Sequence, residues 1–323
     1  MKLTYLFFGN KPDEKWHLAK QMGIRYAIAK LSPELTGQLP PWNAASLKDS
    51  KERFEQQGLT LIGLEGDQFD MSRIKFGLDG RDEDIERYQS MLRNMGELGI
   101  QLLCYNFMAG IGWFRTHTEI EERGGALVSG FSNKYATQLG NSDLGLLDEL
   151  SLWKNYRYFL EAILPVAEQN GIRLALHPDD PPVSPLRGIG RILISPDHID
   201  RALALSSSPA HGLTFCQGTF RSMGSDPIDL ATRWARRIHF IHVRDVVGEP
   251  GNFRETFHDN GPTDMPMLFN HYKKLGLDVP LRSDHVPTMY GEDNRQHGYG
   301  TKGNLFGIGY IKGVMDTLSF NYR

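Results

Sequence analysis

Short apolar runs alternate with longer amphipathic stretches along the whole chain. The apolar runs predict eight strands, which cover residues 3–8, 25–29, 59–64, 101–107, 172–177, 212–216, 238–242 and 279–284. The stretches with helical spacing predict helices over residues 13–22, 45–57, 82–98, 152–170, 197–205, 228–237, 265–274 and 307–319. Regular alternation of strand and helix is typical of α/β proteins, and eight such units predict a (β/α)8 TIM barrel.

One stretch interrupts this alternation. Residues 109–147 hold many Gly, Ser, Thr and Asn residues and form too long a connection for an ordinary loop. We interpret them as an insertion or lid between strands four and five, within one catalytic domain that spans residues 1–323. A doubly wound open sheet also fits the alternation, but the Gly-x-Gly-x-x-Gly turn of its dinucleotide-binding members is absent after the first strand.

Composition and charge narrow the function classes. The 323-residue chain carries 36 basic and 39 acidic residues, giving a net charge of −3 without any block of like charge. Nucleic-acid binding normally needs a basic face, so this balance argues against it. No run approaches the roughly 18 apolar residues of a membrane span, and the N-terminal run has the pattern of a strand rather than a signal peptide. Only Cys104 and Cys216 are present, which argues against a disulfide scaffold and predicts a cytoplasmic protein.

Four successive strands in the second half of the chain each end in a potential metal ligand. These residues are His177, Cys216, His242 and Asp284. A parallel barrel gathers the carboxyl ends of its strands at one face, so we expect the four side chains to lie close together. Two imidazoles, one thiolate and one carboxylate are enough to hold a divalent transition metal.

Each of these residues also has a simpler interpretation. A lone buried His is more often a satisfied structural residue, and a lone Cys at a strand end is usually a small core side chain. Four coincidences at four successive strand ends are much less probable than one metal site. The thiolate and imidazoles suit tetrahedral Zn²⁺, whereas the carboxylate favours a six-coordinate ion, Mn²⁺ first, with Fe²⁺, Co²⁺ or Mg²⁺ as alternatives.

Proton transfer and substrate binding need further groups beside the metal. His285 follows Asp284 directly and suits acid–base chemistry near neutral pH, and Tyr299 lies in a glycine-flanked loop just beyond strand eight. We expect Arg244 to pair with a substrate carboxylate, although a salt bridge explains it equally well. Residues expected to contact hydroxyl groups or orient His177, with solvated loops or turns as the alternative, are His258, Asn260 and Asp179.

Several strings, in this order, resemble the mannonate dehydratase family. They are Cys104–Met108, His177–Pro182, Phe215–Cys216, His242–Arg244 and Arg282–His285. The resemblance runs from near the N-terminus to the last helix. It implies a metal-dependent TIM barrel, related to the xylose-isomerase-like barrels, that removes water from D-mannonate to give 2-keto-3-deoxygluconate in hexuronate breakdown.

The resemblance also implies roles for individual residues. It implies that His177, Cys216, His242 and Asp284 bind Mn²⁺ or a similar ion, and that His285 and Tyr299 occupy the proton-transfer positions. Asn106, within the first string, is expected to bind substrate. The partner would be a small-molecule sugar acid, and the enzyme a homo-oligomer, either dimer or tetramer.

The chain departs from the family pattern at the substrate rim. Family members usually carry a His-His-Ile-Pro-like stretch after strand two, where this chain has Ala29–Pro33, and Gly112 replaces an acidic residue before Trp113. The insertion is also shorter than in the longer members. These changes touch the substrate rim and not the inferred metal cage, so they leave the class of chemistry and open the choice of sugar acid. The alternatives are a sugar isomerase or epimerase on the same barrel, against which the Cys216 thiolate counts, and a metal-dependent nuclease or a non-catalytic sugar-acid binder.

Overall fold

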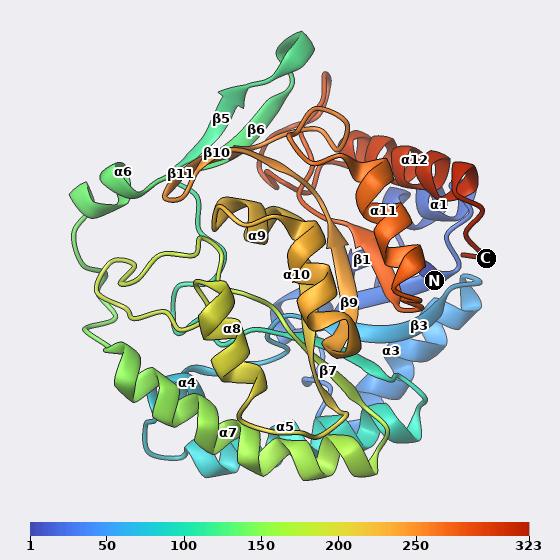
Figure 1. The fold of residues 1–323 in the computed structure, drawn as a ribbon. Helices are drawn as coiled ribbons and strands as arrows, with labels where there is room; N and C mark the ends of the chain where they lie inside the picture. Colours follow the sequence, from blue (N-terminus) through green and yellow to red (C-terminus); the bar gives the residue numbers. More distant parts are fainter. Residues whose placement is uncertain (323) are drawn as a thin grey trace.

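Eight parallel strands close into a barrel in the computed structural model, which describes residues 1–322 (Figure 1). The barrel order is β1-β12-β9-β8-β7-β4-β3-β2. These strands are β1 Lys2–Phe8, β2 Tyr26–Lys30, β3 Thr60–Glu65, β4 Leu102–Tyr105, β7 Arg173–Leu176, β8 His211–Cys216, β9 Ile238–Val243 and β12 Pro280–Ser283. Each predicted strand overlaps one of them, so the predicted (β/α)8 TIM barrel is confirmed.

Most helices cover the outside of the barrel, whereas α6 lies apart from it, next to the β5–β6 hairpin (Figure 1). The helices are α1 Glu14–Gln21, α2 Pro33–Thr36, α3 Ala44–Gln56, α4 Ser72–Phe76, α5 Arg81–Glu97, α6 Asn133–Gln138, α7 Glu149–Gln169, α8 Pro196–Leu203, α9 Gln217–Ser222, α10 Pro227–Trp234, α11 Met265–Lys274 and α12 Thr301–Thr317, with the 3-10 turns η1 Arg123–Gly125 and η2 Ala235–Arg237. Polar side chains fix where several helices begin. The Asp13 side chain accepts hydrogen bonds from two backbone N–H groups of α1, and the Asp148 side chain accepts one from the backbone N–H of Ser151 in α7. None of the helices described over residues 1–322 could span a membrane.

The core has two layers. Every residue of β8 and β9 is buried, as expected for parallel strands covered on both faces. Inside the barrel a small cluster packs together, made of Ile28, Leu102, Cys104, Ala175 and Phe240. A much larger cluster fills the space between the strands and the surrounding helices. This apolar filling leaves the carboxyl ends of the strands as the place where polar side chains collect.

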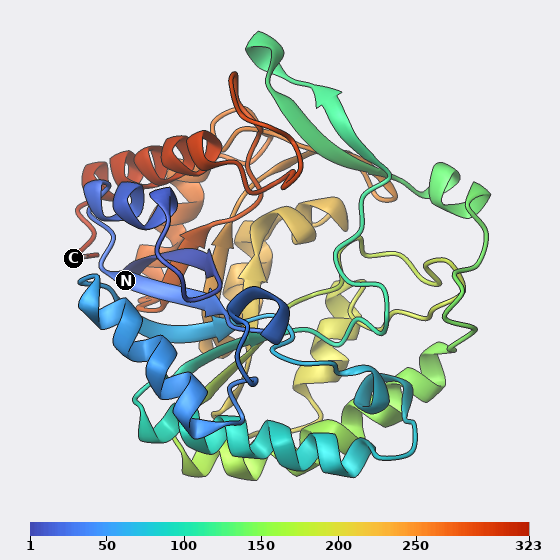
Figure 2. The same cartoon turned by 180° about the vertical axis from the view of Figure 1, so that it is seen from behind.

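The insertion predicted over residues 109–147 is structured. It contains β5 His117–Glu121 and β6 Leu127–Ser132, which pair with β10 Val246–Glu249 and β11 Asn252–Glu255 in a second, antiparallel sheet of order β10-β11-β6-β5. Phe131 lies opposite Phe253 in this sheet, and both are buried. The β5–β6 hairpin projects beyond the body of the molecule in both views (Figures 1 and 2).

We expect Phe54 in α3 to be an anchor of the helix layer. Phe54 is fully buried and stacks on Trp16 with ring centroids 4.1 Å apart. Phe54→Ala removes this contact and leaves a cavity, so it should lower the free energy of unfolding by about 3–5 kcal/mol in urea titrations. Tyr290→Ala, at a side chain 96% exposed, is the matched control and should change it by less than about 0.5 kcal/mol. Equal effects of the two substitutions would contradict this packing.

Candidate metal centre and active site

The four predicted metal ligands meet at one point above the barrel. They come from β7, β8, β9 and β12, which are neighbours in the barrel, and each offers a ligand atom within 4.8 Å of the others. Asp284 Oδ2 lies 3.7 Å from Cys216 Sγ and 3.7 Å from His242 Nδ1. The rings of His177 and His242 have centroids 5.1 Å apart. The structure thus brings together all four residues that the strand ends singled out.

The chemical state of these residues suits a divalent cation. His177 Nδ1 donates to the Pro178 carbonyl at 2.7 Å, which leaves Nε2 with its lone pair. Burial lowers the pKa of His177, so the ring is neutral at pH 7. Although burial alone raises the pKa of Asp284, the positive charges around it, from His285 and Arg282 first, hold that pKa well below its usual value. Asp284 Oδ1 and His242 Nε2 are buried and form no hydrogen bond among the described residues, although Arg282 Nη2 lies 2.9 Å from the first and Glu65 Oε2 lies 3.4 Å from the second.

Glu65, which was not predicted, supports this centre. It ends β3, and Arg282 donates to its carboxylate through Nη2 at 2.5 Å and Nε at 3.0 Å. Its Oε2 lies 3.4 Å from His242 Nε2 and orients that ring. Burial opposes ionisation, but Arg282 and His242 lower the pKa of Glu65 to about 2. The sequence carries a signal for Glu65, because this acidic residue directly follows an apolar run, as each of the four candidate ligands does.

His285 and Tyr299 form a hydrogen-bonded pair beside the four ligands. His285 Nε2 lies 3.1 Å from the Tyr299 hydroxyl, while its Nδ1 lies 3.3 Å from Glu255 Oε1. Trp113 packs on the imidazole with ring centroids 4.3 Å apart. Burial, with the nearby charge of Asp284, raises the pKa of Tyr299, so its phenol stays protonated at neutral pH. The two predicted proton-transfer residues therefore share one hydrogen bond.

A closed ionic network lies behind His285. Arg244 donates to Glu255 Oε1 at 2.8 Å, to Asp180 Oδ2 at 2.6 Å and to Thr219 Oγ1 at 2.9 Å. Arg115 donates to the same two carboxylates, at 2.6 and 3.0 Å to Asp180 and at 2.5 Å to Glu255. Burial raises the pKa of both carboxyl groups, but the two guanidinium groups outweigh it and the net shift is downward.

This network changes the interpretation of Arg244. Its side chain is fully buried, and both of its Nη atoms donate to protein acceptors. The sequence allows two interpretations of Arg244, a pair with a substrate carboxylate or a salt bridge within the protein. In the structure its partners are Asp180, Glu255 and the His285 imidazole, and Arg244 does not line the cavity described below.

Three other predicted residues also lie away from the cavity. Asp179 Oδ2 accepts from the backbone N–H groups of Ile192 and Leu193, both at 2.9 Å, and so holds a loop in place. His258 Nε2 donates to the Val243 carbonyl at 2.9 Å, and burial lowers its pKa to about 4. Asn260 Nδ2 donates to Glu122 Oε1 at 2.7 Å. As far as the structure describes the chain, none of the three lines the cavity wall.

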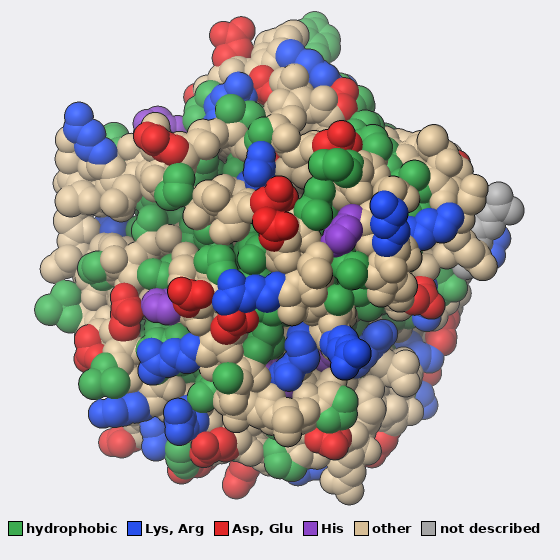
Figure 3. Space-filling model, viewed as in Figure 1, with side chains coloured by type: hydrophobic (Ala, Val, Ile, Leu, Met, Phe, Trp, Pro, Cys, Tyr) green, Lys and Arg blue, Asp and Glu red, His purple; other side chains and the backbone are tan. Residues whose placement is uncertain are grey.

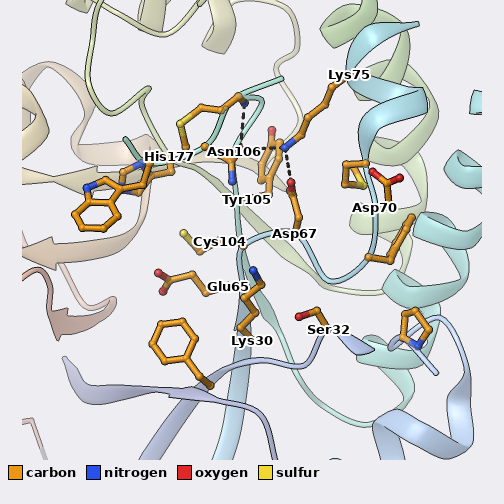
Figure 4. Close-up of a pocket in the computed structure, with 18 of the residues that line it drawn as sticks. Lys30, Ser32, Glu65, Asp67, Asp70, Lys75, Cys104, Tyr105, Asn106 and His177 are labelled. Atoms are coloured by element: carbon orange, nitrogen blue, oxygen red, sulfur yellow. Dashed lines mark hydrogen bonds and ion pairs between the residues drawn. The ribbon is translucent and has the colours of Figure 1, made fainter. Parts of the chain in front are cut away.

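A cavity of about 950 Å³ opens over the strand ends. Its wall includes His177, His242, Asp284 and the His285–Tyr299 pair, together with Asn106. Figure 4 shows His177, Asn106, Tyr105 and Glu65 around this space. On the face seen in Figure 3, acidic and basic side chains are interspersed, without the broad basic area that nucleic acid needs. The arrangement suits a small polar molecule held beside a cation and a proton-transfer pair.

Known proteins resemble this chain along its whole length. A family model described as D-mannonate dehydratase (UxuA) matches residues 1–147 and 141–323. Mannonate dehydratase 2 of Halalkalibacterium halodurans is 31% identical over 352 aligned positions, covering 99% of this chain and 100% of the relative. The mannonate dehydratase of Enterococcus faecalis is 32% identical, with 98% of each chain covered.

Solved structures resemble this chain to different degrees. The crystal structure of mannonate dehydratase from Streptococcus suis serotype 2 has a TM-score of 0.89 and 28% identity, covering 100% of this chain and 97% of that chain. The 3-keto-D-glucoside 4-epimerase from E. coli has a TM-score of 0.63 at 12% identity, covering 97% of this chain and 99% of that chain, and so shares only the fold. The family model, the full-length relatives and the match to a solved dehydratase together show that the chain belongs to the D-mannonate dehydratase family.

Proposed function

We propose that this protein is a metal-dependent hydro-lyase that converts D-mannonate to 2-keto-3-deoxygluconate and water. The observation that carries the proposal is that His177, Cys216, His242 and Asp284 converge within 4.8 Å, beside the hydrogen-bonded His285 and Tyr299, in a chain of this family. The substrate would be a small sugar acid. The cytoplasmic location and the homo-oligomeric state stay predictions.

The four converging residues would hold the ion. Mn²⁺ is the ion we expect, because the set adds a hard carboxylate to two imidazoles and a thiolate, with Fe²⁺, Co²⁺ or Mg²⁺ as alternatives. When bound, a divalent ion supplies Lewis-acid stabilisation of the negative charge that develops beside the substrate carboxylate. Glu65 and Arg282 keep His242 and Asp284 oriented for this task.

His285 and Tyr299 would move the protons. Nδ1 of His285 faces both Glu255 and the Arg244 guanidinium, whereas Nε2 lies beside Tyr299, so Nε2 is the nitrogen that would take the proton from C2 of the substrate. The protonated phenol of Tyr299 would give its proton to the C3 hydroxyl, which leaves as water. Loss of the C2 proton and the C3 hydroxyl produces an enol, which becomes the 2-keto-3-deoxy acid when C3 gains a proton. The 3.1 Å hydrogen bond would return the proton from His285 to Tyr299.

The same barrel fold also serves sugar epimerases, as the 12%-identical structures show. An epimerase or isomerase also removes a proton beside a carbonyl group, but it expels no hydroxyl. The donor set favours dehydration over that alternative, because a thiolate ligand is unusual beside the carboxylate-rich sets we expect for sugar isomerases. Product NMR separates the two reactions, since only dehydration creates a CH₂ group at C3.

Metal loading tests the ligand set. Purified enzyme with Mn²⁺ should release a 2-keto-3-deoxy acid from D-mannonate, and chelation should abolish this turnover until Mn²⁺ is restored. Cys216→Ser should lose bound metal at least tenfold, measured by elemental analysis after dialysis. Cys104→Ser is the matched control, because Cys104 is the other buried cysteine and lies outside the four-residue set. Metal loss in Cys104→Ser alone, or inactivity of the loaded wild type across a panel of aldonic acids, would contradict the proposal.

Removing the proton-transfer groups tests their assignment. His285→Asn and Tyr299→Phe should each lower kcat about 10²–10⁴-fold, because each removes a group that carries a proton in the transition state. Metal content should stay close to that of the wild type, since neither residue belongs to the ligand set. His117→Asn, at an exposed histidine of β5, should leave kcat unchanged. A His285→Asn enzyme with near-normal kcat would rule out the role given to that imidazole.

A further inference from the structure

Lys75 is a buried cation that the proposed proton transfers do not use. Its side chain is 2% exposed, in the short helix α4, and it lines the same cavity as His177, His242 and Asp284. Its Nζ lies 2.6 Å from Asp67 Oδ2 and 3.0 Å from Asn106 Oδ1 (Figure 4). Burying an ammonium group is costly unless it is paired, and Asp67 provides the pair.

The three residues have hydrogen-bonding capacity left over. An ammonium group has three N–H donors, and Lys75 uses two of them on Asp67 and Asn106. The Asn106 side-chain oxygen is occupied, since it accepts from Lys75 and from the Met108 backbone N–H at 3.1 Å. Its Nδ2 amide donates to no acceptor among residues 1–322. Asp67, whose side chain is 37% exposed, keeps a second carboxylate oxygen. Donors and acceptors therefore remain together on one stretch of cavity wall.

Lys75, Asp67 and Asn106 lie close to the candidate metal centre. Asn106 follows Tyr105, and Tyr105 pairs with Leu176, the residue before His177, across the β4–β7 ladder. Asn106 and His177 therefore stand on adjacent strand ends, about 5 Å apart in the hydrogen-bonding direction. Lys75 Nζ donates to Asn106 Oδ1, so it lies farther from His177 by the length of that hydrogen bond. A sugar acid whose carboxylate end lies at the four ligands would extend its other end toward Lys75.

The charges along the cavity wall indicate which chemical group the far end of such a ligand should carry. Acidic side chains outnumber Lys and Arg by seven to five along the described cavity wall, and Asp67 neutralises Lys75 directly. A second anionic group would find no net positive site here. A hydroxyl group both donates and accepts, which matches the free N–H of Lys75, the Nδ2 amide of Asn106 and the free oxygen of Asp67.

We propose that Lys75, Asp67 and Asn106 form a subsite that binds the hydroxyl groups of the sugar acid farthest from its carboxylate. Lys75 is then a specificity-determining residue, and the enzyme selects polyhydroxylated aldonates over truncated ones. This inference rests on the proposed function, because it assumes that the carboxylate end lies at the four ligands. A site built to hydrogen-bond a hydroxyl discriminates strongly against an analogue that lacks it.

Kinetics with two substrates test the subsite. The substrates are D-mannonate and a four-carbon aldonate with the same configuration at C2 and C3, and both are assayed with Mn²⁺. The wild type should prefer D-mannonate by at least about 100-fold in kcat/KM. Lys75→Met should lower kcat/KM for D-mannonate about 10–100-fold and leave the four-carbon substrate nearly unchanged, so the preference shrinks. Lys30→Met is the matched control, because Lys30 lines the same cavity but is one-third exposed, and it should keep the preference.

The ratio of the kcat/KM values for the two substrates distinguishes the possible outcomes. A purely structural role for Lys75 would lower both rates together and leave the preference unchanged, which would overturn the subsite while keeping the proposed function. Faster turnover of a six-carbon acid with a second carboxylate would overturn it too, because that result requires an anion site. A wild-type enzyme with Mn²⁺ that does not turn over D-mannonate would contradict the proposed function and remove the subsite with it.

Discussion

The convergence of four unlike donors at the carboxyl end of the barrel is the constraint on which the rest of the structure depends. An imidazole pair, a sulfur and a carboxylate lie within 4.8 Å of one another, and all but the partly buried His177 are buried, at a place where isolated charge is costly. Such a set is stable only if its charge is balanced. Arg282 and Arg244 partly balance Asp284, and a divalent cation would complete the balance. The barrel supplies the geometry because its neighbouring strands end side by side.

The second sheet and the insertion supply residues that surround the proposed proton-transfer residue His285. Glu255 ends β11, and Arg115 and Trp113 belong to the insertion that carries β5 and β6. These residues surround His285, so one face of the imidazole packs on Trp113 and Nδ1 faces Glu255. The insertion is thus part of the site as well as a projection from the barrel. Whether it also moves as a lid stays a prediction.

The barrel and the convergence of the four candidate ligands were predictable because both follow from local signals. A buried parallel strand is a continuous apolar run, and its last residue is where a polar side chain is exposed to the site. Glu65 carried the same signal and was overlooked. The second sheet was not predictable, since β5 alternates exposed and partly buried residues and the pairing of Phe131 with Phe253 spans more than 100 positions. Nothing local to Lys75 or Arg244 indicates which partners the fold brings to them.

The most direct measurement of the central claim is a crystal structure of the Mn²⁺-loaded protein with anomalous scattering recorded at the manganese edge. We expect one strong peak enclosed by His177, Cys216, His242 and Asp284. Two other groups of donors lie nearby, one containing Glu65 and Cys104 and the other containing Asp180 and Glu255. A peak at either of these in place of the first, or no peak at full Mn²⁺ saturation, would contradict the account.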